Sequence, residues 1–229
     1  MRTPRLRMYL CCGLAIALCI GSTGYSFAQG LGSLKSLAGG GGGSVDINAL
    51  ADNQSALAKR LNAALIEIAG AQINFAKALG NKEQADQLQL VVKSLGQGNT
   101  TEDTLCSCIA STESIGKEQA KKLGEIKQFD ANQKQEIQNG LVPYSKGTAH
   151  TVLLGKEFAE HLKSTQGAMS KASVANLAEI KSKMGLTFSV APKMPGLGTT
   201  HVETASTLIK MAKSNKLNTT EAEKTIGSL

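Results

Sequence analysis

The sequence predicts an all-α protein, an antiparallel bundle of five or six helices, some of them long and coiled-coil-like. Apolar residues recur at a spacing of about 3.5 over most of the chain. Cap-forming residues and Gly- or Pro-containing breaks separate these stretches. Runs of alternating polarity, typical of strands, are nearly absent. We therefore assign residues 46–229 to a single helical-bundle domain.

The first helix is expected to begin after Asp46 as N-cap and to stop at Gly80-Asn81. A helix of this length would be roughly 50 Å long. A shorter amphipathic helix is expected at about 82–95, before the break at 96–99. The stripe of the first helix is formed by Leu50, Leu57, Leu61, Leu65, Ile68, Phe75 and Leu79.

The third helix is expected from Thr100 or Thr101, because acidic residues in its first turn suit the helix dipole. A fourth begins at Asp130, which forms a capping box with Gln133. Pro143 predicts a kink or break in that helix. The two stripes are Leu105, Ile109, Thr112, Ile115, Gln119, Leu123 and Ile126, then Ile137, Leu141, Tyr144, Val152, Phe158 and Leu162.

A fifth helical segment is expected at about 170–184. Residues 185–199 predict a loop, because several Gly and Pro residues occur close together. A short extended segment within this loop is compatible with the sequence. Thr200 with Glu203 predicts a capping box for the next helix, and Thr220 with Glu223 predicts a last short turn.

The N-terminus has the three parts of a secretory signal peptide. Basic residues precede an uncharged stretch from Met8 to Ile20, and small residues stand at Ser26 and Ala28. We expect cleavage of residues 1–28 between Ala28 and Gln29 and export to the periplasm or the medium as a soluble protein. A buried N-terminal helix is the alternative. Leu18 before Cys19 argues against lipid attachment.

Residues 29–45 predict a flexible Gly-rich leader, because five glycines occupy 39–43. Leu31, Leu34 and Leu37 recur every third residue and could dock on the body or on a partner. A disordered tail is the alternative.

Composition and charge restrict the classes of partner that the chain is expected to bind. Signal cleavage would remove three Arg and no acidic residue, which lowers the formal net charge from +7 to +4. That charge, with 3% aromatic residues and no Trp, argues against a nucleic-acid partner. No run reaches the length of a membrane-spanning helix. Peripheral contact with a membrane stays an open alternative that the sequence does not specifically indicate.

Cys106 and Cys108 are the two cysteines left after signal cleavage. They could be structural, with Cys108 facing the core, or form a strained, redox-active disulfide, or bind a soft metal. On a regular helix, positions i and i+2 point apart, so a disulfide would require local unwinding.

No catalytic, cofactor-binding or metal-ligating residues are predicted. The chain has no Gly-x-Ser-x-Gly, phosphate-loop, His-Glu-x-x-His or Glu-x-x-His motif. His150 and His161 are too far apart along a helix to share a metal, and Glu157 with His161 is expected to form a surface pair. Glycines within helical patterns predict close helix crossings, or alternatively a bundle that rearranges or inserts into lipid: Gly70, Gly116, Gly124, Gly140, Gly147 and Gly155.

These observations favour a non-enzymatic interaction or structural module of the bacterial cell envelope. Its partner would be another envelope protein or a second copy of the chain. One alternative is a carrier that binds an apolar small molecule or lipid between the helices. Another is a thiol-redox or soft-metal protein that uses Cys106 and Cys108.

Overall fold

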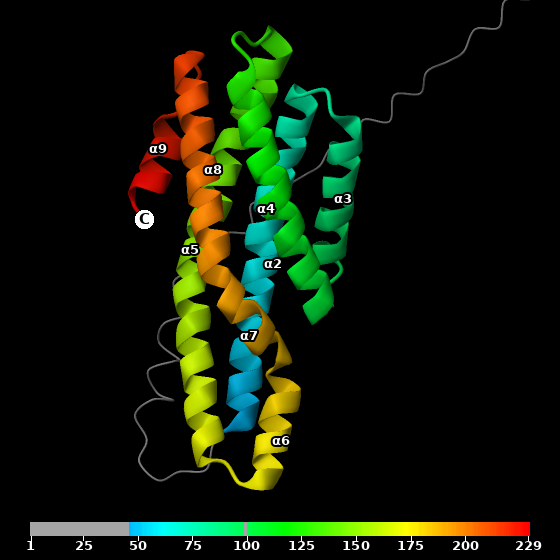
Figure 1. Cartoon of the computed structure of the whole chain (residues 1–229), viewed down its shortest axis with the longest axis vertical. Coiled ribbons are helices and arrows are strands. Elements are labelled where there is room, and N and C mark those ends of the chain that lie inside the picture. The colour runs from blue at the N-terminus through cyan, green and yellow to red at the C-terminus, as the bar shows by residue number, and fades with distance from the viewer. Residues whose placement is uncertain (1–45, 99) are drawn as a thin grey trace, which may run out of the picture.

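The computed structural model describes residues 46–98 and 100–229, and these residues form helices without any strand (Figure 1). The predictions for the signal peptide, its cleavage at Ala28 and Gln29, and the leader with Leu31, Leu34 and Leu37 lie outside the described residues. The helices are α2 (Ile47–Ala78), α3 (Lys82–Gly96), α4 (Glu102–Glu125), α5 (Ala131–Lys171), α6 (Val174–Lys183), α7 (Gly185–Val190), the 3-10 turn η2 (Ala191–Lys193), α8 (Met194–Ser214) and α9 (Thr220–Gly227).

Two long neighbours, α2 and α5, form the axis of the molecule and run in opposite directions (Figure 1). In the upper part, α4 and α8 pack beside them, α3 covers the outer side of α2 and α4, and α9 lies against α5 and α8. At the lower end, α6 packs against α2 and α5, and above it α7 packs against α4 and α5. Among the described residues, no helix combines the length and apolar character needed to cross a membrane.

The predicted helix starts are confirmed where a polar side chain caps the first turn. Asp46 accepts a hydrogen bond from the Ala49 amide at 3.0 Å. Asp130 and Gln133 form the predicted capping box, with bonds of 2.8 and 3.0 Å in opposite directions. Gly80, at φ 66°, ends the turn after α2 in the left-handed region that glycine tolerates.

Residues 185–199 are helical, so the predicted loop is wrong. Thr187, Val190, Met194 and Leu197 are buried at helical spacing across α7, η2 and the start of α8. The prolines do not interrupt this segment because they stand in the first turns of η2 and α8, where the amide has no intrahelical acceptor. The expected capping box at Thr200 is also wrong, since Thr200 lies inside α8.

Pro143 does not break α5, which continues as one helix from Ala131 to Lys171. Packing against α2 and α8 along this length offsets the missing amide hydrogen bond. The helix ends instead at Ala172, and Ser173 caps α6 through the Asn176 amide. The expected segment at 170–184 is therefore divided between two helices.

The apolar core consists of three clusters stacked along the bundle. The upper cluster centres on Phe75, Leu141 and Leu208. The middle cluster centres on Leu61, Phe158 and Leu197. The lower cluster is the smallest, and its buried members are Ile47, Leu50, Ile180 and Met184. The core thus narrows toward the end covered by α6.

Three glycines mark close crossings between helices. A Cβ on Gly140 would lie 2.6 Å from Phe75 Cε1 and 2.9 Å from the Ala71 carbonyl oxygen. A Cβ on Gly147 would lie 3.0 Å from the Ala64 carbonyl oxygen. The predicted close crossings are confirmed there and at Gly116, described below. They are absent at Gly70 and Gly124, where a Cβ would meet no neighbouring atom within 4 Å.

Candidate functional site

Buried polar side chains gather in two layers between the apolar clusters. We call the layer between the upper and middle clusters the upper belt and the layer between the middle and lower clusters the lower belt. The upper belt contains Gln72, Gln84, Thr112, Gln119, Tyr144, His201 and Thr204. The lower belt contains the buried His161, Thr165 and Thr187 together with the half-buried Gln54. These belts bring together most of the buried groups capable of acid–base chemistry or hydrogen bonding.

Glutamines connect three helices in the upper belt. Gln72 of α2 donates from Nε2 to the Thr112 carbonyl of α4 at 2.7 Å. Gln119 of α4 donates back to the Gln72 carbonyl at 2.8 Å, and to Gln84 Oε1 of α3 at 2.9 Å. Gln72 and Gln119 are fully buried, so their side-chain amides lose their hydrogen bonds to water when the chain folds. The hydrogen bonds between the helices replace part of what the amides lose.

A Tyr–His pair forms the other half of the upper belt. The Tyr144 hydroxyl of α5 lies 2.8 Å from His201 Nδ1 of α8, and both side chains are fully buried. Burial, and secondarily the positive charge of Lys117, lowers the pKa of His201 to about 4. Burial raises the pKa of Tyr144, an effect partly offset by its hydrogen bond with Thr204. At neutral pH the neutral tyrosine therefore donates to a neutral imidazole.

Gly116 makes room for this arrangement. A Cβ at this position would lie 2.8 Å from Gln72 Nε2 and 2.9 Å from the Tyr144 hydroxyl. Such distances are too short for any side chain, so only glycine lets α4 approach the two polar groups. The sequence predicts a close crossing here, but the crossing is against polar atoms of the belt.

The lower belt is sparsely hydrogen-bonded. Gln54 Oε1 of α2 accepts from the Thr187 amide at 2.9 Å and from the Thr187 hydroxyl at 2.7 Å. His161 and Thr165, one turn apart on α5, are both fully buried. The two ring nitrogens of His161 have no hydrogen-bond partner among the described residues, and the Thr165 hydroxyl has none there either. Burial lowers the pKa of His161.

Glu157 and His161 do not form the surface pair that the sequence predicts, because both side chains are buried. Glu157 is instead bound by Arg60 of α2. Arg60 Nη2 donates to Glu157 Oε1 at 2.8 Å, and Nη1 donates to Oε2. This two-pronged ion pair lies at the edge of the middle cluster, one turn from His161 on α5.

Cys106 and Cys108 lie two residues apart on α4, and both are free thiols in this structure. Cys108 is buried in the middle cluster, and this burial raises the pKa of its thiol. Cys106 is half-buried against the same cluster. A redox or metal role for the two cysteines stays a prediction.

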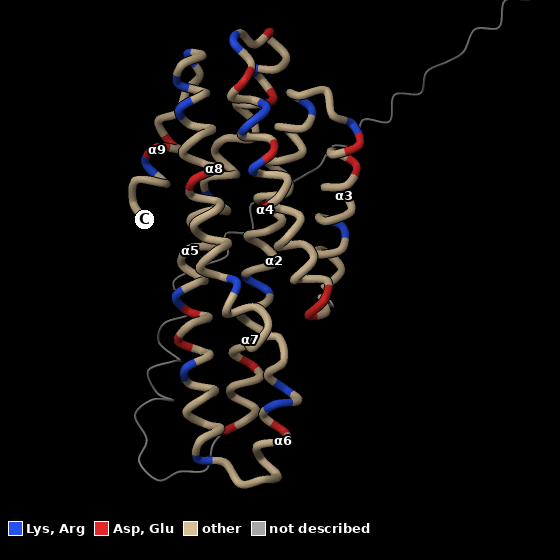
Figure 2. The backbone as a smooth tube through the Cα atoms, viewed as in Figure 1, with Lys and Arg blue, Asp and Glu red and all other residues tan. Residues whose placement is uncertain are grey.

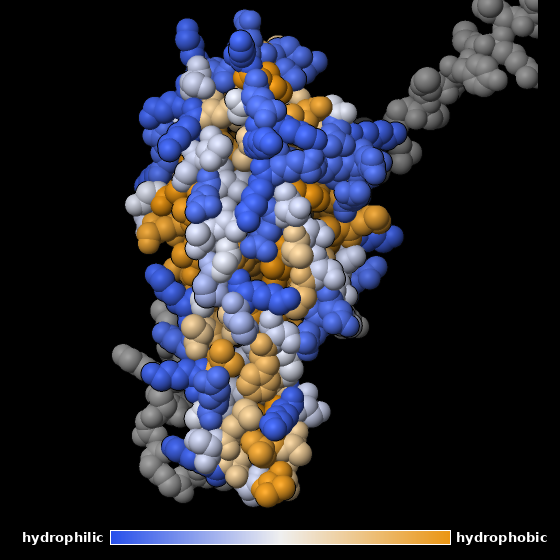
Figure 3. Space-filling model, in the orientation of Figure 1, coloured by the Kyte–Doolittle hydropathy of each residue, from blue (hydrophilic) through white to orange (hydrophobic). Residues whose placement is uncertain are grey.

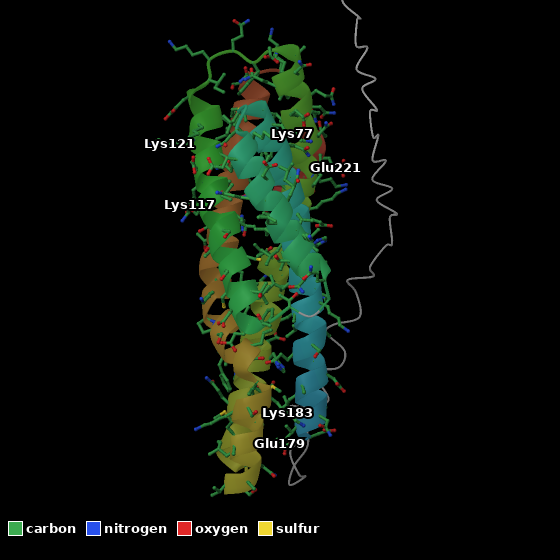
Figure 4. All side chains as sticks on the ribbon, turned by 90° about the vertical axis from the view of Figure 1, so that its right-hand side faces the viewer. Lys77, Lys117, Lys121, Glu179, Lys183 and Glu221 are labelled. Carbon is green, nitrogen blue, oxygen red and sulfur yellow. The ribbon has the colours of Figure 1, made fainter. Side chains whose placement is uncertain are left out.

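The histidines are not brought together. His150 Nδ1 lies 3.0 Å from Glu67 Oε2 on the side of the α2–α5 pair, whereas His161 and His201 occupy different belts. No group of three or more His, Cys, Asp or Glu side chains within the described residues could hold a metal ion. An open hollow between the last turn of α2 and the first turn of α5 is bordered by Lys77, Asp130 and Glu136; Figure 4 labels Lys77 at the upper end of the bundle.

The sequence carried one signal for the belts. Polar residues occupy positions of otherwise apolar stripes, as Thr112 and Gln119 do on α4, and as His161 and Thr165 do one and two turns after Glu157 on α5. Polar residues on a core-facing stripe must find partners inside the protein. Their partners could not be identified, because they come from other helices.

Comparison of the chain with known protein families, curated proteins and solved structures found no match. The function must therefore be inferred from the described residues themselves.

Proposed function

We propose that this chain is an exported interaction or structural module of the bacterial cell envelope, without enzymatic activity. In this proposal the long helices form an antiparallel, coiled-coil-like bundle whose outer faces bind another envelope protein or a second copy of the chain. The leader, through Leu31, Leu34 and Leu37, supplies a second contact.

One observation carries this proposal: three of the side chains suited to acid–base chemistry are enclosed, whereas His150, which pairs with Glu67, is half-buried. Tyr144, His161 and His201 are fully buried and lie inside the belts, away from the surface. An enzyme needs such groups at a pocket that a substrate can enter. Their position favours a role in holding the helices together.

The outer faces support a binding role. Leu90 on α3, Leu153 on α5 and Val174 on α6 are 64%, 45% and 88% exposed. Positively and negatively charged residues are interspersed along the helices (Figure 2), and hydrophobic surface is visible near the middle and at the lower end of the face shown in Figure 3. Exposed apolar side chains within a mixed polar surface are typical of binding sites when they gather into patches.

Photo-crosslinking in the native envelope tests the proposal. A photoreactive residue is placed singly at Leu90, Leu153 and Val174, and at Lys121, an exposed charged position of α4 (Figure 4), as control. We expect one discrete adduct from at least one apolar position and none from Lys121. A mass equal to twice the chain would identify self-association.

Two results would contradict the proposed interaction function. If the apolar positions give no more adduct than Lys121, with and without residues 29–45, the interaction function is wrong. Catalytic turnover by the purified chain would also overturn it.

The alternatives receive less support from the described residues. The carrier hypothesis places gaps at Gly and Ala, yet Gly116, Gly140 and Gly147 are closely contacted by neighbouring atoms. Native mass spectrometry of protein from its own host tests for a bound apolar molecule. The thiol hypothesis is tested by comparing the redox behaviour and metal content of the Cys106→Ser/Cys108→Ser variant.

A further inference from the structure

The lower end of the bundle is covered by α6, which buries few residues, and by α7, which buries Thr187 and Val190. Ile180 is the one fully buried residue within α6, and Met184 at its end joins it in the lower cluster. The polar anchors are these: Gln54 binds Thr187 and the Lys183 carbonyl, Lys183 Nζ donates to Asn48 Oδ1 of α2 at 3.1 Å, and Glu102 of α4 accepts a hydrogen bond from Ser189. A segment with few buried contacts opens at a lower free energy than the rest of a domain.

His161 is fully buried on α5, between residues of the middle cluster and residues of the lower cluster. On α5 it follows Phe158 of the middle cluster and precedes Ala168 of the lower cluster, and α5 contacts both α6 and α7. Its two ring nitrogens have no hydrogen-bond partner among the described residues. A charged imidazole at this position would therefore be buried without compensation.

The charged groups around His161 are already engaged. Glu157, one turn earlier on α5, is bound by both guanidinium nitrogens of Arg60 from α2. Glu102 of α4 accepts from Ser189, and on α6 Lys183 pairs with Glu179 at the surface (Figure 4). The sequence of α7, Gly185–Val190, contains no charged residue. Each of these carboxylates already binds a partner in the closed bundle.

We propose that α6 and α7 form an acid-labile latch, in which protonation of His161 releases them from α5 and uncovers the lower cluster. This regulation goes beyond the proposed interaction function and does not depend on it. Once the latch opens, water reaches the imidazolium and supplies the hydrogen bonds that the closed bundle lacks.

The sign of the pH effect follows from burial. The pKa of His161 is lowered from 6.5 in the closed bundle, whereas an opened latch restores the ordinary value. The open form therefore binds the proton more tightly and gains population as the pH falls below about 6.5. One proton changes the opening equilibrium by at most about tenfold per pH unit.

Hydrogen exchange of the full chain, read by mass spectrometry between pH 7.5 and 5, tests the latch. Protection factors are corrected for the intrinsic pH dependence of amide exchange. We expect protection of residues 174–193 to fall by up to about tenfold per pH unit below pH 6.5. Protection near Phe75 in the upper cluster should change less over the same interval.

Two variants separate the latch from general acid sensitivity. His161→Leu should make the protection of residues 174–193 independent of pH in this interval, because no proton is taken up there. His201→Leu, the matched control in the upper belt, should leave their pH dependence intact. Equal pH dependence in His161→Leu and the unchanged chain would overturn the proposal, as would flat protection in the unchanged chain.

If His161→Leu does not fold, NMR titration of the His161 ring in the unchanged chain tests the proposal instead. We expect the ring to stay neutral in the closed form at pH 6 and to gain its proton together with chemical-shift changes in α6 and α7. A ring that becomes charged at pH 6.5 without such changes would contradict the latch.

Discussion

The Tyr144 hydroxyl and His201 Nδ1 lie 2.8 Å apart, and their rings meet edge to face with centroids separated by 5.7 Å. This contact joins α5 to α8 at the level where the apolar core is interrupted by the upper belt. The hydroxyl and Nδ1 satisfy each other inside the bundle, whereas His201 Nε2 has no hydrogen-bond partner among the described residues. Their mutual dependence makes the pair a sensitive probe of the bundle.

Tyr144→Phe should lower the free energy of unfolding by about 1–3 kcal/mol, because His201 Nδ1 would stay buried without a donor. Urea unfolding at pH 7.5 measures the change. Adding His201→Phe should recover part of the loss, since the unpaired nitrogen is then absent. If the two substitutions proved strictly additive, the hydrogen bond would not couple the two side chains.

Acid should weaken the bundle through His201. Its pKa is about 4 in the folded chain and near 6.5 when unfolded, so the unfolded chain binds the proton more tightly. The contribution of neutral His201 to the free energy of unfolding is fully present above about pH 6.5. It is lost progressively as the pH falls toward 4, by up to ~1.4 kcal/mol per pH unit. Urea unfolding at pH 7.5, 6.0 and 5.0 should show this slope.

The matched variant for that titration is His201→Gln, which cannot take up a proton. Its stability should depend less on pH over the same interval than that of the unchanged chain. Identical slopes in the two proteins would assign the acid sensitivity to other groups.

Two glycine substitutions should have opposite effects. Gly140→Ala should destabilise the fold by about 1–3 kcal/mol, because its Cβ would meet Phe75 and the Ala71 carbonyl oxygen at the α2–α5 crossing. Gly70→Ala, inside α2, has no such neighbour and should stabilise it by about 0.5–1 kcal/mol. Thermal unfolding of both variants checks the pair, and a stabilising Gly140→Ala would contradict the crossing.

The Arg60–Glu157 pair should matter more than an exposed ion pair. Arg60→Met would leave a buried carboxylate without its guanidinium, and should cost about 2–4 kcal/mol of stability. Lys122→Met removes the exposed partner of Glu118 on α4 and should cost less than about 0.5 kcal/mol. Chemical unfolding compares the two. Similar small losses would mean that solvent screens Glu157 more than its burial indicates.

The sequence predicted the helical class and most helix starts, because caps and apolar stripes are local signals. Asp130 with Gln133 is the clearest case, since both partners of the capping box lie within one turn. The loop predicted at 185–199 is wrong because that prediction also depends on local signals alone. Its Gly and Pro residues favour a loop locally, whereas burial of Val190 and Met194 against other helices fixes a helical path.

The belts could be predicted only in part. A polar residue on an apolar stripe, such as Gln119, is visible in the sequence, but its acceptor on Gln72 depends on how α2 and α4 pack. The same holds for His161 and Glu157. Their spacing on α5 is compatible with a surface pair, and only the position of α2 and Arg60 buries them. Side-chain partners from distant segments are set by packing, which periodicity does not encode.

The alternation of apolar clusters with polar belts fixes the register of the helices. An apolar stripe with a regular repeat can slide against its neighbour by one turn, about 5.4 Å, and still bury leucine against leucine. Sliding α4 past α2 would separate Gln119 from the Gln72 carbonyl and place a buried amide against apolar side chains. The glutamines and the Tyr–His pair thus select one alignment among several that the leucines alone would accept.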